Sequence, residues 1–356
     1  NAQFLVFLSA FIKGVDEYQD FLRSTVASAG NDHRLGASEA PPAIVSIFLG
    51  DELTAVLKSI EEDTYFGEHQ NVQLETGAHV LPHFVKDNTD RNRTSPFAFT
   101  GNKFEFRMLG SSASVATPNI ILNTAVAEAL SQFAKELEGT APEEMEHAVH
   151  ELIKRAVKKH KKVIFNGNGY TEEWIEEAKK RGLYNLVSTP DCLPQFIADK
   201  NVELFTKHHI FTKEEIFSRY EILLENYVKT ISIEAKTMKE MLAKDFLPAV
   251  ERYAAAVSDN MRSMKALAPS VPTASAASLV AFLGEAYEKI SSSLDVLEKE
   301  IQETDKKTSM QEAADYCHNT LLASMEELRK TADEAEAKIP DEELPYPTYD
   351  ALLFSV

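Results

Sequence analysis

The sequence is poor in cysteine and contains no long apolar run. Among 356 residues there are two cysteines, Cys192 and Cys317, and they lie too far apart to form a metal-binding motif. We expect both to be free thiols in a reducing cytosol, and therefore a cytoplasmic protein. No stretch approaches the roughly 18 apolar residues of a membrane-spanning helix, and no basic-then-apolar signal segment is present. The sequence therefore predicts no membrane partner.

Basic residues are also scarce. There are 37 lysines and arginines against 56 aspartates and glutamates, which gives a formal net charge of −19. This balance argues against general binding to nucleic acid or to an anionic membrane, because both need basic surfaces. The sequence also lacks a phosphate-binding glycine loop, a Cys/His metal spacing and a nucleophile elbow. The enzyme classes that these motifs define are therefore not indicated.

The length and the first residues indicate part of a large protein. A chain of 356 residues suffices for two to three domains, and contents of 44% hydrophobic and 26% charged residues are typical of a globular protein. The chain begins N-A-Q-F-L-V-F-L, without methionine and inside an apparent amphipathic helix. We therefore expect it to be a piece of a longer protein.

The strongest chemical pattern lies in residues 90–107, D-R-N-R-T-S-P-F-A-F-T-G-N-K-F-E-F-R. The alternation at its end predicts a strand with Phe104 and Phe106 on one face. Lys103, Glu105 and Arg107 would then share the other face. A row of cation, anion and cation needs a cleft, a metal or an anionic ligand to offset the desolvation of its charges. An edge strand with a solvated charged face would show the same alternation, so the pattern alone leaves both interpretations open.

Hydrophobic periodicity predicts helices over most of the first 200 residues. An amphipathic helix is expected in residues 1–29, with Gly30 as its C-cap, followed by a polar loop over residues 31–42. Pro41 and Pro42 are expected to start another helix that reaches about Glu62. The remaining expected elements are a strand in 71–86 and helices over 119–138, 142–162 and 171–181.

The last third of the chain is predicted to be a helical hairpin or bundle. Thr212 and Glu215 form a capping box at the start of a long helix, which Pro248 is expected to kink. A linker over residues 268–276 leads to a helix whose apolar residues recur at spacings of four and three, which predicts a heptad seam. A third helix is expected over about 310–338. The predicted seam residues are Leu283, Tyr287, Ile290, Leu294, Leu297 and Ile301.

Four motifs in order resemble glutamine synthetase, most closely its long bacterial type III form. N-D-H-R-L-G-A-S-E-A-P (31–41) resembles the family's substrate loop, and D-R-N-R-T-S (90–95) resembles its Arg-Asn-Arg-Ser segment. G-N-K-F-E-F-R (101–107) resembles its Arg-x-Glu-x-Arg strand, and P-N-I-I-L (118–122) its Asn-Pro-Tyr-Leu helix start. Weaker similarities are I-F-T-K-E-E-I-F-S-R-Y and the final L-L-F-S-V.

The resemblance implies an α+β fold that is mostly helical in this chain. Residues 1–233 would be the C-terminal part of a glutamine synthetase/guanido kinase-type catalytic domain, an antiparallel sheet with helices. Residues 234–343 would be a long helical extension typical of type III, coiled-coil-like in character. Residues 344–356 would be a tail that returns to the catalytic domain.

The family reaction joins ammonia to L-glutamate at the expense of ATP, through a γ-glutamyl phosphate. By resemblance, Glu105 would ligate Mg²⁺ or Mn²⁺, and Arg107 would contact the γ-carboxyl or the transferring phosphoryl group. Arg93 would stabilise that phosphoryl group. The chemistry agrees, since phosphoryl transfer needs positive charge around the moving group and a hard cation needs carboxylate oxygens.

The substrate loop and the nucleotide site add further expected roles. By resemblance, Arg34 would bind the glutamate carboxylate, although it lies one residue nearer the Glu-Ala-Pro than is usual in the family. Glu39 would shield the intermediate from water and help to bind or deprotonate ammonium. Lys103 would lie near ATP where the family usually has an arginine, and Ala98 replaces another nucleotide-contacting arginine.

The expected partners are glutamate, ammonium, ATP, the N-terminal half of the same protein and neighbouring subunits. By resemblance the assembly would be a ring-type homo-oligomer, a dodecamer, without nucleic acid or membrane. The family's other metal ligands come from earlier strands, so this chain alone is predicted to be inactive. Two alternatives stay open: a γ-glutamyl-polyamine or other amine ligase of the same family, and a non-catalytic scaffold that keeps the fold.

Overall fold

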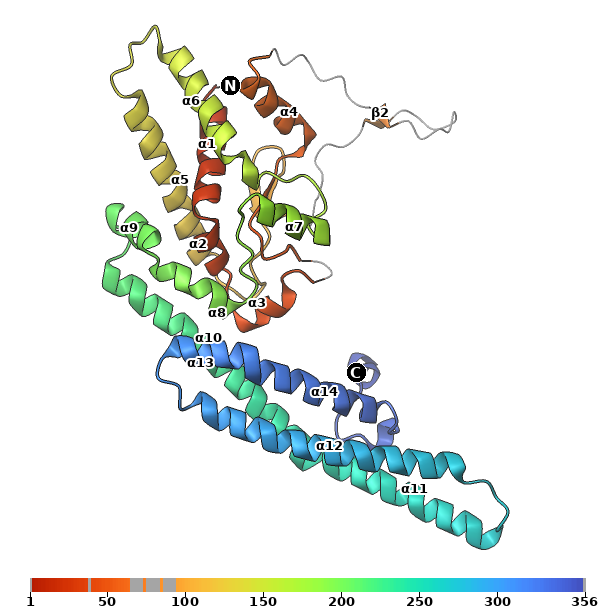
Figure 1. Ribbon diagram of the computed structural model, residues 1–356. Coiled ribbons are helices and arrows are strands. Elements are labelled where there is room, and N and C mark those ends of the chain that lie inside the picture. The colour runs from red at the N-terminus through yellow and green to blue at the C-terminus, as the bar shows by residue number, and fades with distance from the viewer. Residues whose placement is uncertain (1, 38–39, 65–72, 75–83, 86–93, 355–356) are drawn as a thin grey trace. The chain divides into compact units, whose positions relative to one another are not determined.

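The computed structural model describes residues 2–37, 40–64, 73–74, 84–85 and 94–354. The chain divides into two compact units, Asn1–Leu223 and Leu224–Val356. Figure 1 shows both with their elements labelled. None of the helices in the described ranges is both long enough and apolar enough to cross a membrane.

The first unit is built around helix α1 (Ala2–Glu17), against which α5 (Ala116–Leu137) and α6 (Met145–His160) pack. Residues Leu8 to Asp16 of α1 are buried on every side, as expected for a helix inside a core. Gly14 allows α5 to come close, because an added Cβ would lie 3.3 Å from the backbone of Ala125.

A small mixed sheet lies beside α1. Its strands are β1 (Ile47–Phe48), β4 (Phe97–Phe99) and β5 (Phe104–Phe106), in the order β1-β4-β5. The β1–β4 pair is parallel and the β4–β5 pair is antiparallel, so the predicted α+β class is confirmed but the sheet is not purely antiparallel.

The predicted alternation of residues 103–107 is confirmed by the aromatic packing of β5. The ring of Phe104 stacks on Phe11 of α1 with a centroid distance of 3.8 Å, and Phe106 stacks on Phe97 at 4.5 Å. Phe11 also meets Phe97 edge to face at 5.4 Å. The phenylalanine face of the hairpin is therefore fixed to α1, and the charged residues belong to the opposite face.

Three sequence-based boundaries were wrong in this unit. The helix expected over 1–29 is two helices, α1 and α2 (Gln19–Ser24), because the backbone leaves the helical region at Tyr18. The polar loop expected at 31–42 begins as helix α3 (Ala29–Arg34), with Gly30 inside it. The Ser28 side chain starts α3 by accepting a hydrogen bond from the Asn31 backbone.

The helix expected from Pro41 to Glu62 is strand β1 followed by α4 (Gly50–Glu61). The apolar run A-I-V-S-I-F-L is buried in a parallel strand pair, where strands read as continuous apolar segments. Gly50 has a φ of +78° at the turn into α4, and Asn166 Oδ1 accepts hydrogen bonds from the Leu49 and Gly50 backbones.

The other expected helices of the first unit are present as α5, α6 and α7 (Glu172–Lys180). The 3₁₀ segments η1 (Lys161–Val163) and η2 (Leu193–Ile197) follow α6 and α8. The strand expected in 71–86 falls on β2 (Gln73–Leu74) and β3 (Phe84–Val85), an antiparallel pair whose surroundings lie outside the described residues. The unit also contains α8 (Thr189–Cys192) and α9 (Asp199–Lys207).

The second unit is an antiparallel set of long helices. Helix α10 (Lys213–Met241) contains the boundary between the units, and its start in the first unit has the predicted capping box, since Glu215 accepts from the Thr212 backbone at 2.8 Å and Thr212 Oγ1 accepts from Glu215 at 3.3 Å. Helix α12 (Ala274–Thr304) packs on α11 (Leu247–Leu267) and α14 (Leu322–Glu336). The seam is confirmed at Leu283, Ile290, Leu294, Leu297 and Ile301, which are buried, while Tyr287 is half-buried.

Two π-helical segments interrupt these long helices. The first, η3 (Leu242–Phe246), lies directly before α11. Pro248, which was expected to kink the long helix, lies in the first turn of α11. The second, η4 (Cys317–Leu321), separates α13 (Met310–Tyr316) from α14. The end of the described chain holds η5 (Asp341–Glu343) and α15 (Tyr349–Phe354). The return of residues 344–356 to the first unit stays a prediction.

The heptad seam predicts a sharp difference between two neighbouring residues of α12. Leu297 is fully buried, whereas Val296 is 48% exposed. Leu297→Ala should lower the free energy of unfolding by about 2–5 kcal/mol in urea denaturation, because it leaves a cavity in the seam. Val296→Ala, the matched control, should change it by less than about 0.5 kcal/mol. Equal effects of the two variants would contradict the seam.

Candidate active-site hairpin

The β4–β5 hairpin presents the predicted charged row. Its turn is closed by a hydrogen bond of 2.9 Å from the Thr100 backbone to the Lys103 carbonyl, and Gly101 takes a φ of +92°. At the other end the Arg107 N–H donates to the Pro96 carbonyl at 2.8 Å. This register sets Glu105 opposite Ala98. The hairpin therefore holds Glu105 and Arg107 on a rigid pair of strands.

Glu105 and Arg107 form an ion pair on this face. Arg107 donates from Nη2 to Glu105 Oε2 at 2.9 Å, with side-chain exposures of 18% for Arg107 and 41% for Glu105. The hydrogen bond from Arg107 holds the pKa of Glu105 below its ordinary value, and the charges of Arg107 and Lys103 act in the same direction. Glu105 is therefore ionised near neutral pH. Lys103 is exposed at the turn.

Arg34 connects α3 to the end of β5. Its Nη2 donates to the Arg107 carbonyl at 3.0 Å, and its Nη1 donates to the Met108 carbonyl at 3.0 Å and to Asn31 Oδ1 at 2.9 Å. The structure thus brings Arg34 to the backbone of Arg107. These bonds use part of a guanidinium with five N–H donors, and the predicted binding of glutamate by Arg34 stays a prediction.

Asn31 is a supporting residue that sequence reasoning missed. It is buried, and its Nδ2 donates to the carbonyls of Val26 at 2.7 Å and Met108 at 3.0 Å. Asn31 therefore connects the N-cap of α3, Ser28, and the side chain of Arg34 to the Met108 carbonyl after β5. Because the bonding partner Met108 lies far along the chain, only the tertiary structure reveals this role.

A second anchor of α3 is the ion pair between buried Arg23 and partly buried Asp32. Arg23 Nη2 lies 3.2 Å from Asp32 Oδ1, and Asp32 Oδ2 accepts from the Thr189 backbone at 2.7 Å. Arg23 also donates to the carbonyls of Leu186 and Val187, each at 2.8 Å. Burial raises the pKa of Asp32 despite these donors. In the sequence, Arg23 directly follows Phe21 and Leu22 in an expected helix, and this position could have indicated a buried arginine.

Two of the predicted residues, Glu39 and Arg93, lie outside the described residues. The loop that carries Glu39 is closed at its base, where the Gly36 N–H donates to the Pro41 carbonyl at 3.0 Å. Gly36 has a φ of +78°, which favours glycine there. The described part of the site is therefore α3, the base of this loop and the hairpin.

Glu105 fits one ligand position of a hard divalent cation. Mg²⁺ prefers six oxygen ligands, and a partly exposed ionised carboxylate is a suitable one. In the part of the chain that the structure describes, the one group of three His, Cys, Asp or Glu residues close enough to share an ion is Asp63, His150 and Glu151, which does not include Glu105. The remaining ligands of an ion on Glu105 must come from elsewhere.

Comparisons with known proteins show which family this chain resembles. A sequence model of the glutamine synthetase C-terminal domain matches residues 148–265. A glutamine synthetase from Butyrivibrio fibrisolvens is 47% identical over 357 residues, covering 100% of this chain and 51% of that protein. The chain belongs to the glutamine synthetase family. A type-3 glutamine synthetase from Dictyostelium discoideum is 39% identical, over 99% of this chain and 49% of its own length.

The chain spans about half the length of the curated relatives it matches. A glutamine synthetase from Bacteroides fragilis is 34% identical over 100% of this chain and 50% of that protein. These glutamine synthetases cover the helical extension as well as the hairpin. The domain model ends at residue 265, beyond the boundary between the two units and beyond residue 234, where the extension was expected to begin.

Asn31 offers a test of how α3 is held against the hairpin. Asn31→Ala should lower the free energy of unfolding by about 1–3 kcal/mol, because it leaves the Val26 carbonyl and one Arg34 N–H without their buried partner. Asn119→Ala, at an exposed position of α5, should change it by less than about 0.5 kcal/mol. Urea denaturation measures both. An unchanged free energy of unfolding in the Asn31→Ala variant would contradict the role of Asn31 in holding α3 against the hairpin.

Proposed function

We propose that this chain forms one wall of the active site of an ATP-dependent glutamate–ammonia ligase. The reaction would convert ATP, L-glutamate and ammonia to ADP, phosphate and L-glutamine through a γ-glutamyl phosphate. The observation that carries the proposal is the Glu105–Arg107 ion pair on a rigid hairpin, in a chain 47% identical to a glutamine synthetase.

The geometry of the hairpin suits phosphoryl transfer. That chemistry requires positive charge held in place around the moving phosphoryl group and little covalent participation by the protein. Arg107 directly follows β5, and its backbone is bonded on both sides, to Pro96 through its N–H and to Arg34 through its carbonyl. We assign Arg107 to the γ-carboxyl or phosphoryl group, Arg93 to the phosphoryl group and Lys103 to ATP.

Glu105 is assigned to the metal. Mg²⁺ or Mn²⁺, when bound, would neutralise phosphate charge and orient ATP against glutamate. In the described structure Arg107 holds one carboxylate oxygen of Glu105, so the pair keeps Glu105 ionised and Arg107 in place before any ligand arrives. With the ion bound, Arg107 and the ion would each hold one oxygen of the Glu105 carboxylate, or the ion would take the carboxylate and Arg107 would turn to the phosphate.

The loop roles depend on the connection between α3 and β5. Because Arg34 donates to the Arg107 carbonyl, the base of the Glu39 loop and the phosphate-contacting strand are fixed to one another. We assign Arg34 to the glutamate carboxylate through its remaining N–H groups. Glu39 would close over the intermediate, exclude water and receive a proton from ammonium.

A complete enzyme needs more than this chain. The further metal ligands would come from the N-terminal half of the protein, and neighbouring subunits of a ring-type homo-oligomer, a dodecamer by resemblance, would complete each site. Within the chain we propose a catalytic part over 1–233, an assembly-forming helical extension over 234–343 and a returning tail over 344–356. The chain alone would be inactive.

A γ-glutamyl-polyamine or other amine ligase would use the same phosphoryl chemistry with a different acceptor. Comparison of turnover with ammonia and with larger amines in the intact protein separates the two, and a preference for amines would overturn our choice. A non-catalytic scaffold would need no charged row, so the ion pair on the hairpin argues against it.

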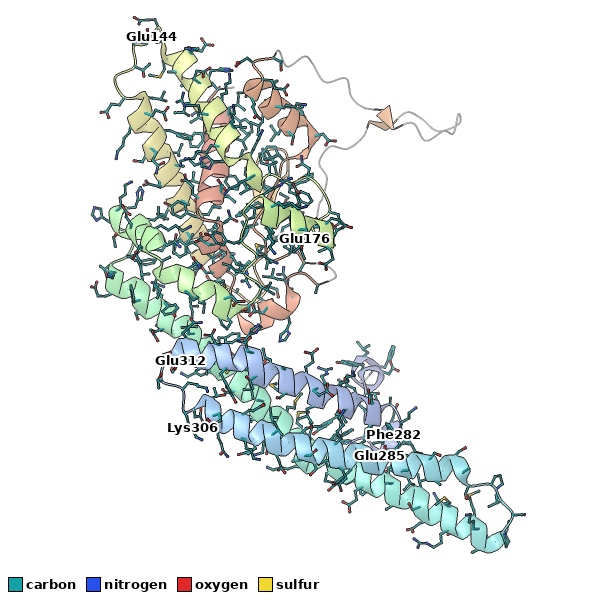
Figure 2. All side chains as sticks on the ribbon, viewed as in Figure 1. Glu144, Glu176, Phe282, Glu285, Lys306 and Glu312 are labelled. Atoms are coloured by element: carbon teal, nitrogen blue, oxygen red, sulfur yellow. The ribbon has the colours of Figure 1, made fainter. Side chains whose placement is uncertain are left out.

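Replacement of Glu105 tests the proposed metal role. Glu105→Gln in the intact protein should lower metal-dependent turnover by roughly 10²-fold or more and raise the Mg²⁺ concentration that gives half-maximal rate. The fold should be unaffected, because Glu105 is partly exposed. Glu176→Gln on the exposed surface of α7, labelled in Figure 2, is the control and should retain full activity. Unchanged turnover of Glu105→Gln at ordinary Mg²⁺ would exclude Glu105 as a ligand.

A further inference from the structure

A cavity with many charged lining residues lies in the first unit, away from the hairpin. It encloses about 480 Å³ between α4, the end of α6 with η1, and α7, a volume within the range of small-molecule sites. One of its lining residues, Ile164, bridges to Ile47 of β1. Since the sheet order is β1-β4-β5, this wall lies at the opposite edge of the sheet from Glu105.

The cavity is basic although the chain as a whole is strongly acidic. Six cationic side chains and one carboxylate, Glu61, line it. Acids outside the lining also touch these cations: Asp16 meets Lys162, Glu62 meets Lys58 and Glu177 meets Arg181. With these included, cations still exceed acids six to four. The cations are Lys58, Lys158, Lys159, Lys161, Lys162 and Arg181.

The cations lie at or just beyond the C-terminal ends of three different helices, where helix dipoles favour them. Lysines in the last turn of α6 are favoured by the partial negative charge of that helix end. Lys58 lies in the last turn of α4 and Arg181 is the C-cap of α7, so each is favoured by the dipole of its own helix and not by that of α6. Cationic residues from three elements therefore line one cavity.

Arg181 is held rigidly at the rim. Its Nη1 donates to the carbonyl of Ile164 at 2.9 Å and of Lys162 at 3.3 Å, and its Nε donates to Glu177 at 2.9 Å. The guanidinium also lies 5.4 Å from the centre of the Trp174 ring. A cation fixed in this way can attract an anion without losing side-chain freedom on binding.

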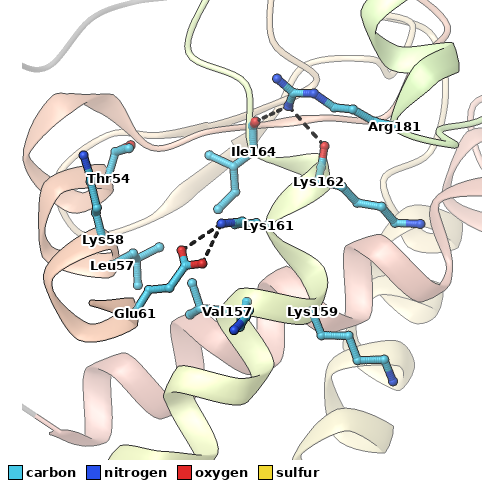
Figure 3. Close-up of a pocket in the computed structure, with 11 residues that line it drawn as sticks. Thr54, Leu57, Lys58, Glu61, Val157, Lys159, Lys161, Lys162, Ile164 and Arg181 are labelled. Atoms are coloured by element: carbon cyan, nitrogen blue, oxygen red, sulfur yellow. Dashed lines mark hydrogen bonds and ion pairs between the residues drawn. The ribbon is translucent and has the colours of Figure 1, made fainter. Parts of the chain in front are cut away.

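Glu61 shows how a carboxylate is held here. Lys161 Nζ lies 2.6 Å and 2.9 Å from its two oxygens, and Figure 3 shows this pair inside the cavity with Arg181 above it. Glu61 is the last residue of α4, where the helix dipole disfavours a carboxylate. The surrounding cations offset that cost. Leu57, Val157 and Ile164 supply apolar wall beside the pair.

We propose that this cavity binds a small organic polyanion, a molecule with two or more carboxylate or phosphate groups on a short skeleton. An anionic group of the ligand would displace Glu61 from Lys161, a second would lie toward Arg181 and Lys58, and the carbon skeleton would contact the apolar wall. The site is separate from the hairpin and does not depend on the proposed ligase activity.

Isothermal titration of the intact protein with citrate and with pyrophosphate, at constant ionic strength, tests this proposal. At least one probe should bind saturably, and Lys161→Gln should weaken that binding roughly 10-fold by removing a charge-assisted contact. Glu61→Gln should strengthen it several-fold by removing the competing carboxylate. Binding of citrate alone indicates a polycarboxylate ligand, and of pyrophosphate alone a phosphorylated one.

The matched control is Lys180→Gln, which removes the same charge from an exposed position of α7 outside the cavity. It should change the affinity less than about twofold, since exposed charges are screened by salt. Unfolding temperatures of the three variants check that the fold is retained. Equal losses for Lys161→Gln and Lys180→Gln, weaker binding by Glu61→Gln, or no saturable binding of either probe would overturn the proposal.

Discussion

The first unit depends on the packing of one aromatic face of a hairpin against a single helix. Phe104 stacks on Phe11 of α1, and Phe97 meets the same ring edge to face. Because successive residues of a strand point to opposite faces, this packing leaves Glu105 and Arg107 no position but the other face. A shift of one residue would turn the charges toward α1 and the rings away from it, so the stacking of the half-buried Phe104 and Phe106 fixes the register of the charged row.

The second requirement is that the neighbouring loop be held against this strand. Arg34 and Asn31 both donate to the Met108 carbonyl, and the Arg23–Asp32 pair ties α3 to the backbone of Leu186, Val187 and Thr189. These bonds join segments far apart in the sequence. They hold α3 and the end of β5 against one another.

The periodicity of apolar residues predicted strand β5 and the buried face of α12. The alternation at Lys103–Arg107 gave β5, and the four-and-three spacing from Leu283 gave the buried seam of α12. It failed at 41–62, because a short apolar run reads alike as a buried strand or a helix. The resemblance assigned Glu105, Arg107 and Arg34 to one site, whereas the bonds of Arg34 to carbonyls and the approach of Lys58 and Arg181 to the basic run at 158–162 depend on tertiary contacts that no local pattern reports.

The central claim is that the carboxylate of Glu105 binds the metal of a ligase. The most direct test is a crystal structure of the intact protein with ATP, glutamate and Mn²⁺, recorded near the manganese absorption edge. The account predicts an anomalous peak within coordination distance of a Glu105 oxygen, with the Arg107 guanidinium beside a phosphate or carboxylate of the ligands. Manganese bound entirely by other residues, with Glu105 still paired only to Arg107, would contradict it.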